Sequence, residues 1–128
     1  PNPFKKQQTK SFKKSNKVPS GLIAHTSQGY FYIKGEKKFK FVSDNAMLSW
    51  NLPIIETTVE TLSKYASSGI LGYRDGSLVK DISDGKIYLI SDSKRRHIVD
   101  PDVLEWLDSE IIKIGQKELF VHPEGEKL

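Results

Sequence analysis

Residues 22–50 read LIAHTSQGYFYIKGEKKFKFVSDNAMLSW, and residues 78–106 read LVKDISDGKIYLISDSKRRHIVDPDVLEW. The two stretches align without a gap, so that Leu22 matches Leu78 and Trp50 matches Trp106. Extended to the full length of both copies, 10 of 53 aligned pairs are identical, where ordinary residue frequencies would give about three. The matched positions are mostly apolar, glycine or helix-cap types, which build a scaffold rather than carry out chemistry.

The sequence therefore predicts an arm at 1–19, a first module at 20–72, a connector at 73–75 and a second module at 76–128. Each module is close to the lower size at which a hydrophobic core alone holds a fold. The chain has no cysteine to add a covalent cross-link. We expect the modules to pack on each other or on partner subunits.

Both modules show the same local signals. A short strand, a polar turn and an apolar strand (Tyr30–Ile33 or Ile87–Ile90) are followed by a second turn and a return strand, which is a hairpin pattern. A helix start comes next, at Ser43 or Asp44 in the first module and at Asp100-Pro101 in the second. An isoleucine-rich piece and a second short helix or turn close each module. The unit reads β-β-β-α-turn-α, an α+β fold, and residues 69–72 are interpreted as a connector between copies.

Positive charge is concentrated at the start of the chain. Residues 1–19 contain six lysines and no acidic residue, whereas the whole chain has a net charge of +4. An arm of this kind can dock on a neighbouring subunit, contact nucleic acid or remain a solvated tail. We expect docking, with the aromatic side chains seated in apolar pockets. The predicted docking residues are Phe4, Lys5, Lys6, Lys10, Phe12, Lys13, Lys14 and Lys17.

The second module resembles a known bacterial repeat. The matching pieces are Gly76–Val79, Ile87–Ile90, Lys94–Ile98 and the Pro123–Gly125 ending. They resemble a module reading roughly GTLV…YLI.GKRRPI…p.G, which occurs in surface-associated and virion structural proteins of bacteria and phages. The chain departs from it at His97, where the family has proline, and at the turn Ser91-Asp92-Ser93. The resemblance implies a non-catalytic assembly module and carries over no site residue.

Two further groups of side chains are candidates for binding. Tyr30 and Phe39 are candidate interface aromatics, because hairpin alternation places some of the first module's aromatic side chains outside one core. They could form a subunit interface or a carbohydrate platform. Lys94, Arg95 and Arg96 are a candidate basic patch, with a solvated strand face as the alternative.

The sequence offers no support for an enzyme, a metal site or a cofactor. The three histidines are far apart, with no second ligand at helical spacing. No nucleophile motif or glycine-rich phosphate loop occurs. The acids between 100 and 110 do not match a calcium loop, and acids suit the start of a helix.

We therefore expect a non-enzymatic structural subunit of a large assembly, in particular a bacteriophage virion protein in a capsid-decoration, head–tail connector or tail and baseplate position. Its partners would be other protein subunits. One alternative is a binding module for a cell-envelope glycan or protein; another is a nucleic-acid-associated protein acting through the arm. No apolar segment follows the first lysines as in a signal peptide, and Pro1 is compatible with a processed intracellular product. The expected location is the virion or the cytoplasm.

Overall fold

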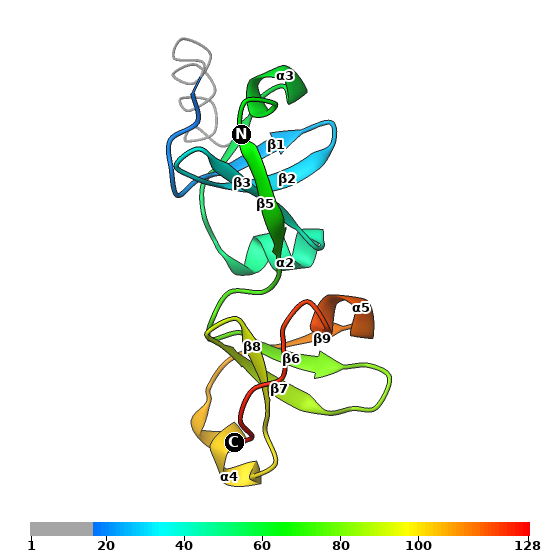
Figure 1. Cartoon of the computed structure of the whole chain (residues 1–128). Helices are drawn as coiled ribbons and strands as arrows, with labels where there is room; N and C mark the ends of the chain where they lie inside the picture. Colours follow the sequence, from blue (N-terminus) through cyan, green and yellow to red (C-terminus); the bar gives the residue numbers. More distant parts are fainter. Residues whose placement is uncertain (1–16) are drawn as a thin grey trace. The chain divides into compact units, whose positions relative to one another are not determined.

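The computed structural model describes residues 17–128, which form two units (Figure 1). Unit 1 ends at Leu71, and unit 2 is Gly72–Leu128. The described residues hold two sheets with nine strands and four short helices. The predicted α+β class is thereby confirmed.

Unit 1 is a five-stranded sheet with two short helices. Its strand order is β4-β1-β2-β3-β5. Strands β1, β2 and β3 are antiparallel neighbours, while β4 pairs parallel with β1 and β5 pairs parallel with β3. The elements are β1 Ile23–Thr26, β2 Gly29–Lys34, β3 Lys37–Phe41, α2 Asp44–Ser49, β4 Ile54–Glu56, α3 Val59–Leu62 and β5 Ala66–Leu71.

Both faces of this sheet are covered by apolar side chains. Neighbouring residues of a strand point to opposite faces, so Ile23 and Ala24 start two separate clusters. One cluster contains Val18, Ala24, Phe31, Ile33, Ile55 and Leu62 of α3. The other contains Ile23, Phe41 and Met47 of α2, with Tyr32 and Trp50 partly buried against them. Figure 1 shows α2 and α3 at opposite ends of unit 1.

Val18 belongs to the folded unit, although it lies within the stretch 1–19 that the sequence assigned to the arm. Its side chain is buried, and its backbone N–H donates a hydrogen bond of 2.8 Å to the Tyr65 hydroxyl. The rest of the predicted arm, up to residue 16, lies outside the described residues.

Two of the unit 1 strands were not predicted. β4 is too short for an alternating pattern to appear. β5 contains Ser67, Ser68 and Gly69, all exposed, and is held mainly by backbone pairing with β3. The interpretation of residues 69–71 as a connector was therefore wrong, because backbone hydrogen bonds leave no signature in side-chain hydropathy.

Unit 2 repeats the order of the first six elements of unit 1 and has no counterpart of strand β5. Its strand order is β8-β7-β6-β9, with β6 and β9 parallel and the other neighbours antiparallel. A parallel bridge joins Arg95 of β8 to Glu124 where unit 1 has β5. The elements are β6 Leu78–Asp81, β7 Ile87–Ser91, β8 Lys94–His97, α4 Pro101–Trp106, β9 Ile111–Ile114 and α5 Gln116–Leu119.

The gap-free alignment of the two copies holds in the first hairpin only. Ile23 pairs with Tyr32, and their aligned counterparts Val79 and Tyr88 pair in the same way. On the next strand Tyr32 pairs with Phe39, whereas Tyr88 pairs with His97 instead of Arg95, the aligned counterpart of Phe39. The second hairpin of unit 2 is therefore out of register with the sequence alignment.

The helices after this hairpin are also displaced, by one residue. Ser43 caps α2 and Asp100 caps α4, although the alignment matches Asp100 with Asp44. Trp50 is the C-cap residue of α2, but Trp106 is still the last residue of α4. One residue turns a side chain by about 100° around a helix. The two tryptophans thus match in sequence without occupying equivalent places.

Their surroundings differ accordingly. The Trp50 ring packs 5.5 Å from the Tyr32 ring and 6.2 Å from the Phe41 ring, centroid to centroid. Trp106 is 77% exposed, and α4 contains no buried residue. The expectation that all the matched side chains serve folding was wrong for Trp106 and for Leu48, which is 61% exposed.

A buried histidine holds the end of unit 2 together. His122 Nδ1–H donates to the Ser93 carbonyl at 2.7 Å, and its Nε2 accepts the Tyr73 N–H at 2.9 Å. The ring fills the space beside Gly72, where any Cβ would overlap it. Ser93 and Asp92 occupy the β7–β8 turn at positive φ, 63° and 53°, a conformation that hairpin turns require but that costs most side chains free energy.

The matched tryptophans give a direct test of the one-residue displacement. Trp50→Ala should lower the free energy of unfolding by about 2–4 kcal/mol, because it removes a half-buried aromatic side chain from the α2 cluster. Trp106→Ala should change it by less than about 0.5 kcal/mol, as an exposed substitution does. Urea unfolding of the full chain followed by circular dichroism measures both. Equal losses would contradict the displacement.

The His122 site gives a pH dependence. Burial is the main cause that lowers the pKa of His122 below its ordinary value of 6.5. Below that value the unfolded chain binds more protons than the folded chain, so the free energy of unfolding should fall as the pH is lowered from about 7. The slope from this group cannot exceed about 1.4 kcal/mol per pH unit, which corresponds to a difference of one whole proton. Urea unfolding measured across this pH range should show that the free energy of unfolding changes less with pH in His122→Gln than in the control His25→Gln. Identical slopes in the two variants would contradict the role of His122.

Candidate functional site

A polar recess of about 460 Å³ opens on the side of unit 1 where β1, β4 and the start of α2 meet. Parallel pairing brings His25 of β1 opposite Glu56 of β4. Asp44 is the first residue of α2. The recess is lined by His25, Thr26, Ser27, Gly29, Tyr30, Asp44, Glu56 and Thr57.

Three side chains in this recess form one connected group. His25 Nδ1–H donates to the Glu56 carboxylate, with its oxygens at 2.9 and 3.1 Å. The Tyr30 ring stacks on the His25 ring, with centroids 4.2 Å apart and planes at 22°. The His25 and Glu56 side chains are 34% and 42% exposed, so solvent reaches both. An aromatic ring, two carboxylates and hydroxyl groups facing one opening suit a ligand rich in hydroxyl groups.

Unit 2 has a second recess, of about 360 Å³, between the β6–β7 turn and α4. Its apolar lining consists of Ile87, Ile98, Val99, Pro101 and Leu104, and its polar lining of Asp84, Gly85, Lys86 and His97. We call it the α4 recess. It is more apolar than the unit 1 recess, because five apolar side chains line it alongside His97 and Asp84, and no tyrosine ring does.

Asp81 explains part of that difference. It stands at the hairpin position that His25 occupies in unit 1, but it is buried and closes the β6–β7 turn. Its Oδ1 accepts the Ser83 N–H at 2.8 Å and the Ser83 hydroxyl at 2.7 Å. These hydrogen bonds are the main cause that lowers the pKa of the Asp81 carboxyl below its ordinary value. In unit 2 this position serves folding, whereas in unit 1 it faces solvent.

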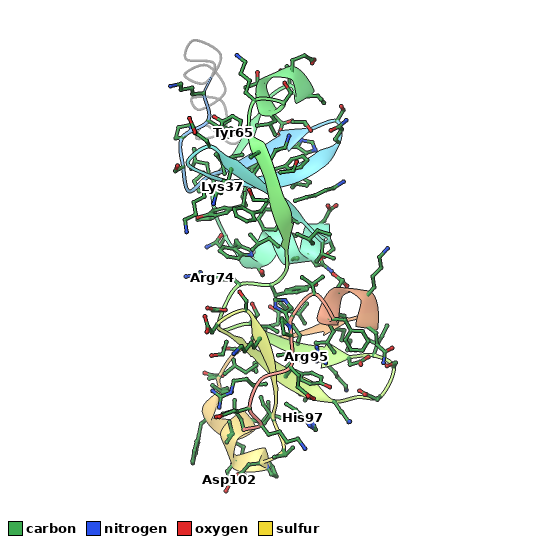
Figure 2. The ribbon with its side chains drawn as sticks, in the orientation of Figure 1. Lys37, Tyr65, Arg74, Arg95, His97 and Asp102 are labelled. Atoms are coloured by element: carbon green, nitrogen blue, oxygen red, sulfur yellow. The ribbon has the colours of Figure 1, made fainter. Side chains whose placement is uncertain are left out.

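The surface around α4 combines exposed apolar and acidic side chains. Val99 is 55% exposed and Trp106 is 77% exposed. Residues 97–112 contain no lysine or arginine. The acids in this stretch are Asp100, Asp102, Glu105, Asp108 and Glu110, all exposed. Asp102 projects from α4 in Figure 2.

The predicted docking residues fall mostly outside the described part of the chain. Lys17 is described and exposed. Phe4, Lys5, Lys6, Lys10, Phe12, Lys13 and Lys14 precede residue 17 and lie outside the described residues.

The candidate interface aromatics Tyr30 and Phe39 lie on the neighbouring strands β2 and β3 of the unit 1 sheet. Tyr30 lines the recess, whereas Phe39 lies beside Tyr32, with ring centroids 6.4 Å apart, and does not line it. The two side chains therefore do not form one platform around the recess.

The three residues of the candidate basic patch do not have the same surroundings. The guanidinium of Arg95, which is labelled in Figure 2, lies 4.9 Å from the centre of the Phe120 ring and donates to the His122 carbonyl. Arg96 Nε donates to the Glu126 carbonyl at 2.9 Å. Both arginines thus bind the C-terminal segment of unit 2, and Lys94 is exposed.

His25, Asp44 and Glu56 were not among the predicted site residues. Glu56 lies far along the chain from His25 and meets it only through the parallel pairing of β1 with β4. No local spacing reveals such a contact, and the β4 strand was itself missed. Within residues 17–128, no group of three or more histidine, cysteine or acidic side chains is placed to hold a metal ion.

The chain matches no protein-family model, no curated protein and no solved structure. Among the helices of residues 17–128, none is both long enough and apolar enough to cross a membrane.

Proposed function

We propose that the chain is a non-enzymatic structural subunit of a large protein assembly, of the bacteriophage virion kind, that attaches to neighbouring subunits. The N-terminal arm and the α4 surface are its attachment elements. The modules provide a small folded body on which these elements are held.

The observation that carries this proposal is the exposure of apolar side chains around α4. An amphipathic helix in a small domain normally buries its apolar stripe. α4 carries Val103, Leu104 and Trp106 but buries none of them fully. Exposed tryptophan is uncommon on monomer surfaces and is among the residues that contribute most at interfaces.

We further propose that the two units are diverged copies of one module. Both have two successive hairpins, a capped six-residue helix, a strand parallel to the first strand and a short closing helix. Duplication followed by divergence accounts for this shared order. It also accounts for the different exposure of α2 and α4, because after a duplication a given surface has to be kept in only one of the two copies.

The arm can be tested by comparing two deletions. Deleting residues 1–16 should leave the urea unfolding midpoint unchanged and should release the chain from its native particle in gradient sedimentation. Deleting residues 1–19 should in addition destabilise unit 1 by about 1–3 kcal/mol, because it removes buried Val18. If the variant that lacks residues 1–16 stays in the particle fraction, the arm has no role in attachment. If the intact chain sediments by itself and not with a particle, the assembly function itself is contradicted.

A second candidate function is recognition of a saccharide at the unit 1 recess. The stacked Tyr30 and His25 rings beside Glu56 and Asp44 favour it, since sugars bind to aromatic faces flanked by hydrogen-bonding groups. The nucleic-acid alternative depends on the lysines of the arm.

The saccharide alternative predicts selective loss of binding. On a glycan array, the intact chain should retain one class of glycan, and Tyr30→Ala should weaken that binding at least about tenfold, by removing the aromatic face. Phe39→Ala is the matched control, because Phe39 is an aromatic residue of the same sheet outside the recess. No binding by the intact chain, or equal losses in both variants, would exclude this function.

A further inference from the structure

We propose that the α4 recess binds the N-terminal segment of a second copy of this chain, with Phe12 in the recess and the neighbouring lysines beside its acidic rim. This inference rests on the proposed assembly function and names the partner and the surface. It links copies head to tail, because the segment of one copy meets unit 2 of the next.

The recess has the chemistry of a pocket for one aromatic side chain. Ile87, Ile98, Val99, Pro101 and Leu104 supply an apolar lining, and its volume is about 360 Å³. Pro101 and Leu104 are on α4, and Val99 beside them is 55% exposed. Covering these side chains would remove apolar surface from water, which favours association.

Charge identifies the occupant. Residues 76–128 carry eleven acids against eight lysines and arginines, a net charge of −3. Asp84 lines the recess, and Asp100 and Asp102 are the sequence neighbours of Pro101, which also lines it. Lys86 and His97 also line the recess, so the attraction comes from the surrounding acids. Residues 1–16 carry five lysines and no acid, which makes the N-terminal segment a complementary partner.

The order of residues in the segment favours Phe12 over Phe4. Phe12 has Lys10 on one side and Lys13 and Lys14 on the other. An aromatic residue with lysines on both sides matches an apolar recess with acids in and next to its lining. Phe4 has Pro3 before it and lysines only after it.

The length of the segment fits this contact. Phe12 precedes buried Val18 closely enough in the chain to lie within about 20 Å of it even when the segment is fully extended. Docking would bring unit 2 of one copy close to unit 1 of the next. Such a head-to-tail contact between identical chains continues into rings or filaments.

The test is a charge exchange in the full-length chain. One variant carries Lys13→Glu and Lys14→Glu, and the other carries Asp102→Lys and Glu105→Lys on α4. The matched control carries Glu36→Lys and Glu60→Lys, two exposed acids of unit 1. Circular dichroism confirms that each variant is folded, and sedimentation velocity measures self-association.

The unaltered chain should associate with rising concentration, and the association should weaken as salt is raised from about 0.05 M to about 0.5 M. Each charge variant alone should associate at least about tenfold more weakly, because one partner of the contact has the wrong sign. Mixing the two variants should restore association, since the lysine segment of one meets the acidic recess of the other. The control should behave as the unaltered chain.

A pair of aromatic variants tests the pocket separately from charge. Phe12→Ala should weaken self-association at least about tenfold, whereas Phe4→Ala should change it by less than about threefold. Equal effects would overturn the assignment of Phe12 to the recess.

Three other outcomes would overturn the inference. A chain that stays monomeric at every concentration has no such contact. Loss of association in the segment variant but not in the α4 variant would place the segment elsewhere. Failure of the mixture to associate would exclude docking between copies. Each of these leaves the proposed function standing if the intact chain still sediments with its native particle.

Discussion

The rotational position of a six-residue helix relative to its sheet decides how the two units differ. In unit 1 the helix starts after Ser43, so Met47 and Trp50 face the sheet and close the second apolar cluster. In unit 2 the helix starts after Asp100, one residue later relative to the sequence repeat, and Trp106 turns into solvent. Because a helix has about 3.6 residues per turn, this small displacement separates a core tryptophan from a surface tryptophan.

The two units also differ at the hairpin position where the sequence alignment matches His25 with Asp81. The Asp81 carboxylate accepts hydrogen bonds from Ser83 and Gln116, so unit 2 uses this position to fix a turn. His25 instead pairs with Glu56 at the solvent-exposed edge of unit 1. Unit 2 buries Asp81 and His122 with their hydrogen bonds, together with apolar side chains such as Leu78, Ile90 and Leu119. α4 contributes no buried residue, and its surface is the one for which we propose a contact with another subunit.

The sequence allowed the hairpins, the helix starts and the α+β class to be predicted, because hydropathy alternation and cap residues act locally. Asp100 with Pro101 was correctly predicted as a helix start for this reason. β4 and β5 were missed because short parallel strands are defined by backbone pairing with distant partners. The exposure of Trp106 was missed because the gap-free alignment concealed the changed register of the second hairpin, which only strand pairing reveals. His25, Asp44 and Glu56 meet through that same long-range pairing, so the unit 1 recess had no local signal.

α4 contains no buried residue, and the proposed contact between chains would cover it. Amide hydrogen exchange of the full chain, compared for peptides spanning α2 and α4, tests this contact most directly. In dilute protein at high salt, α2 should be protected and α4 should exchange rapidly, as expected of a helix without buried side chains. In concentrated protein at low salt, α4 alone should gain protection. Protection of α4 equal to that of α2 in the dilute, high-salt sample would contradict the account.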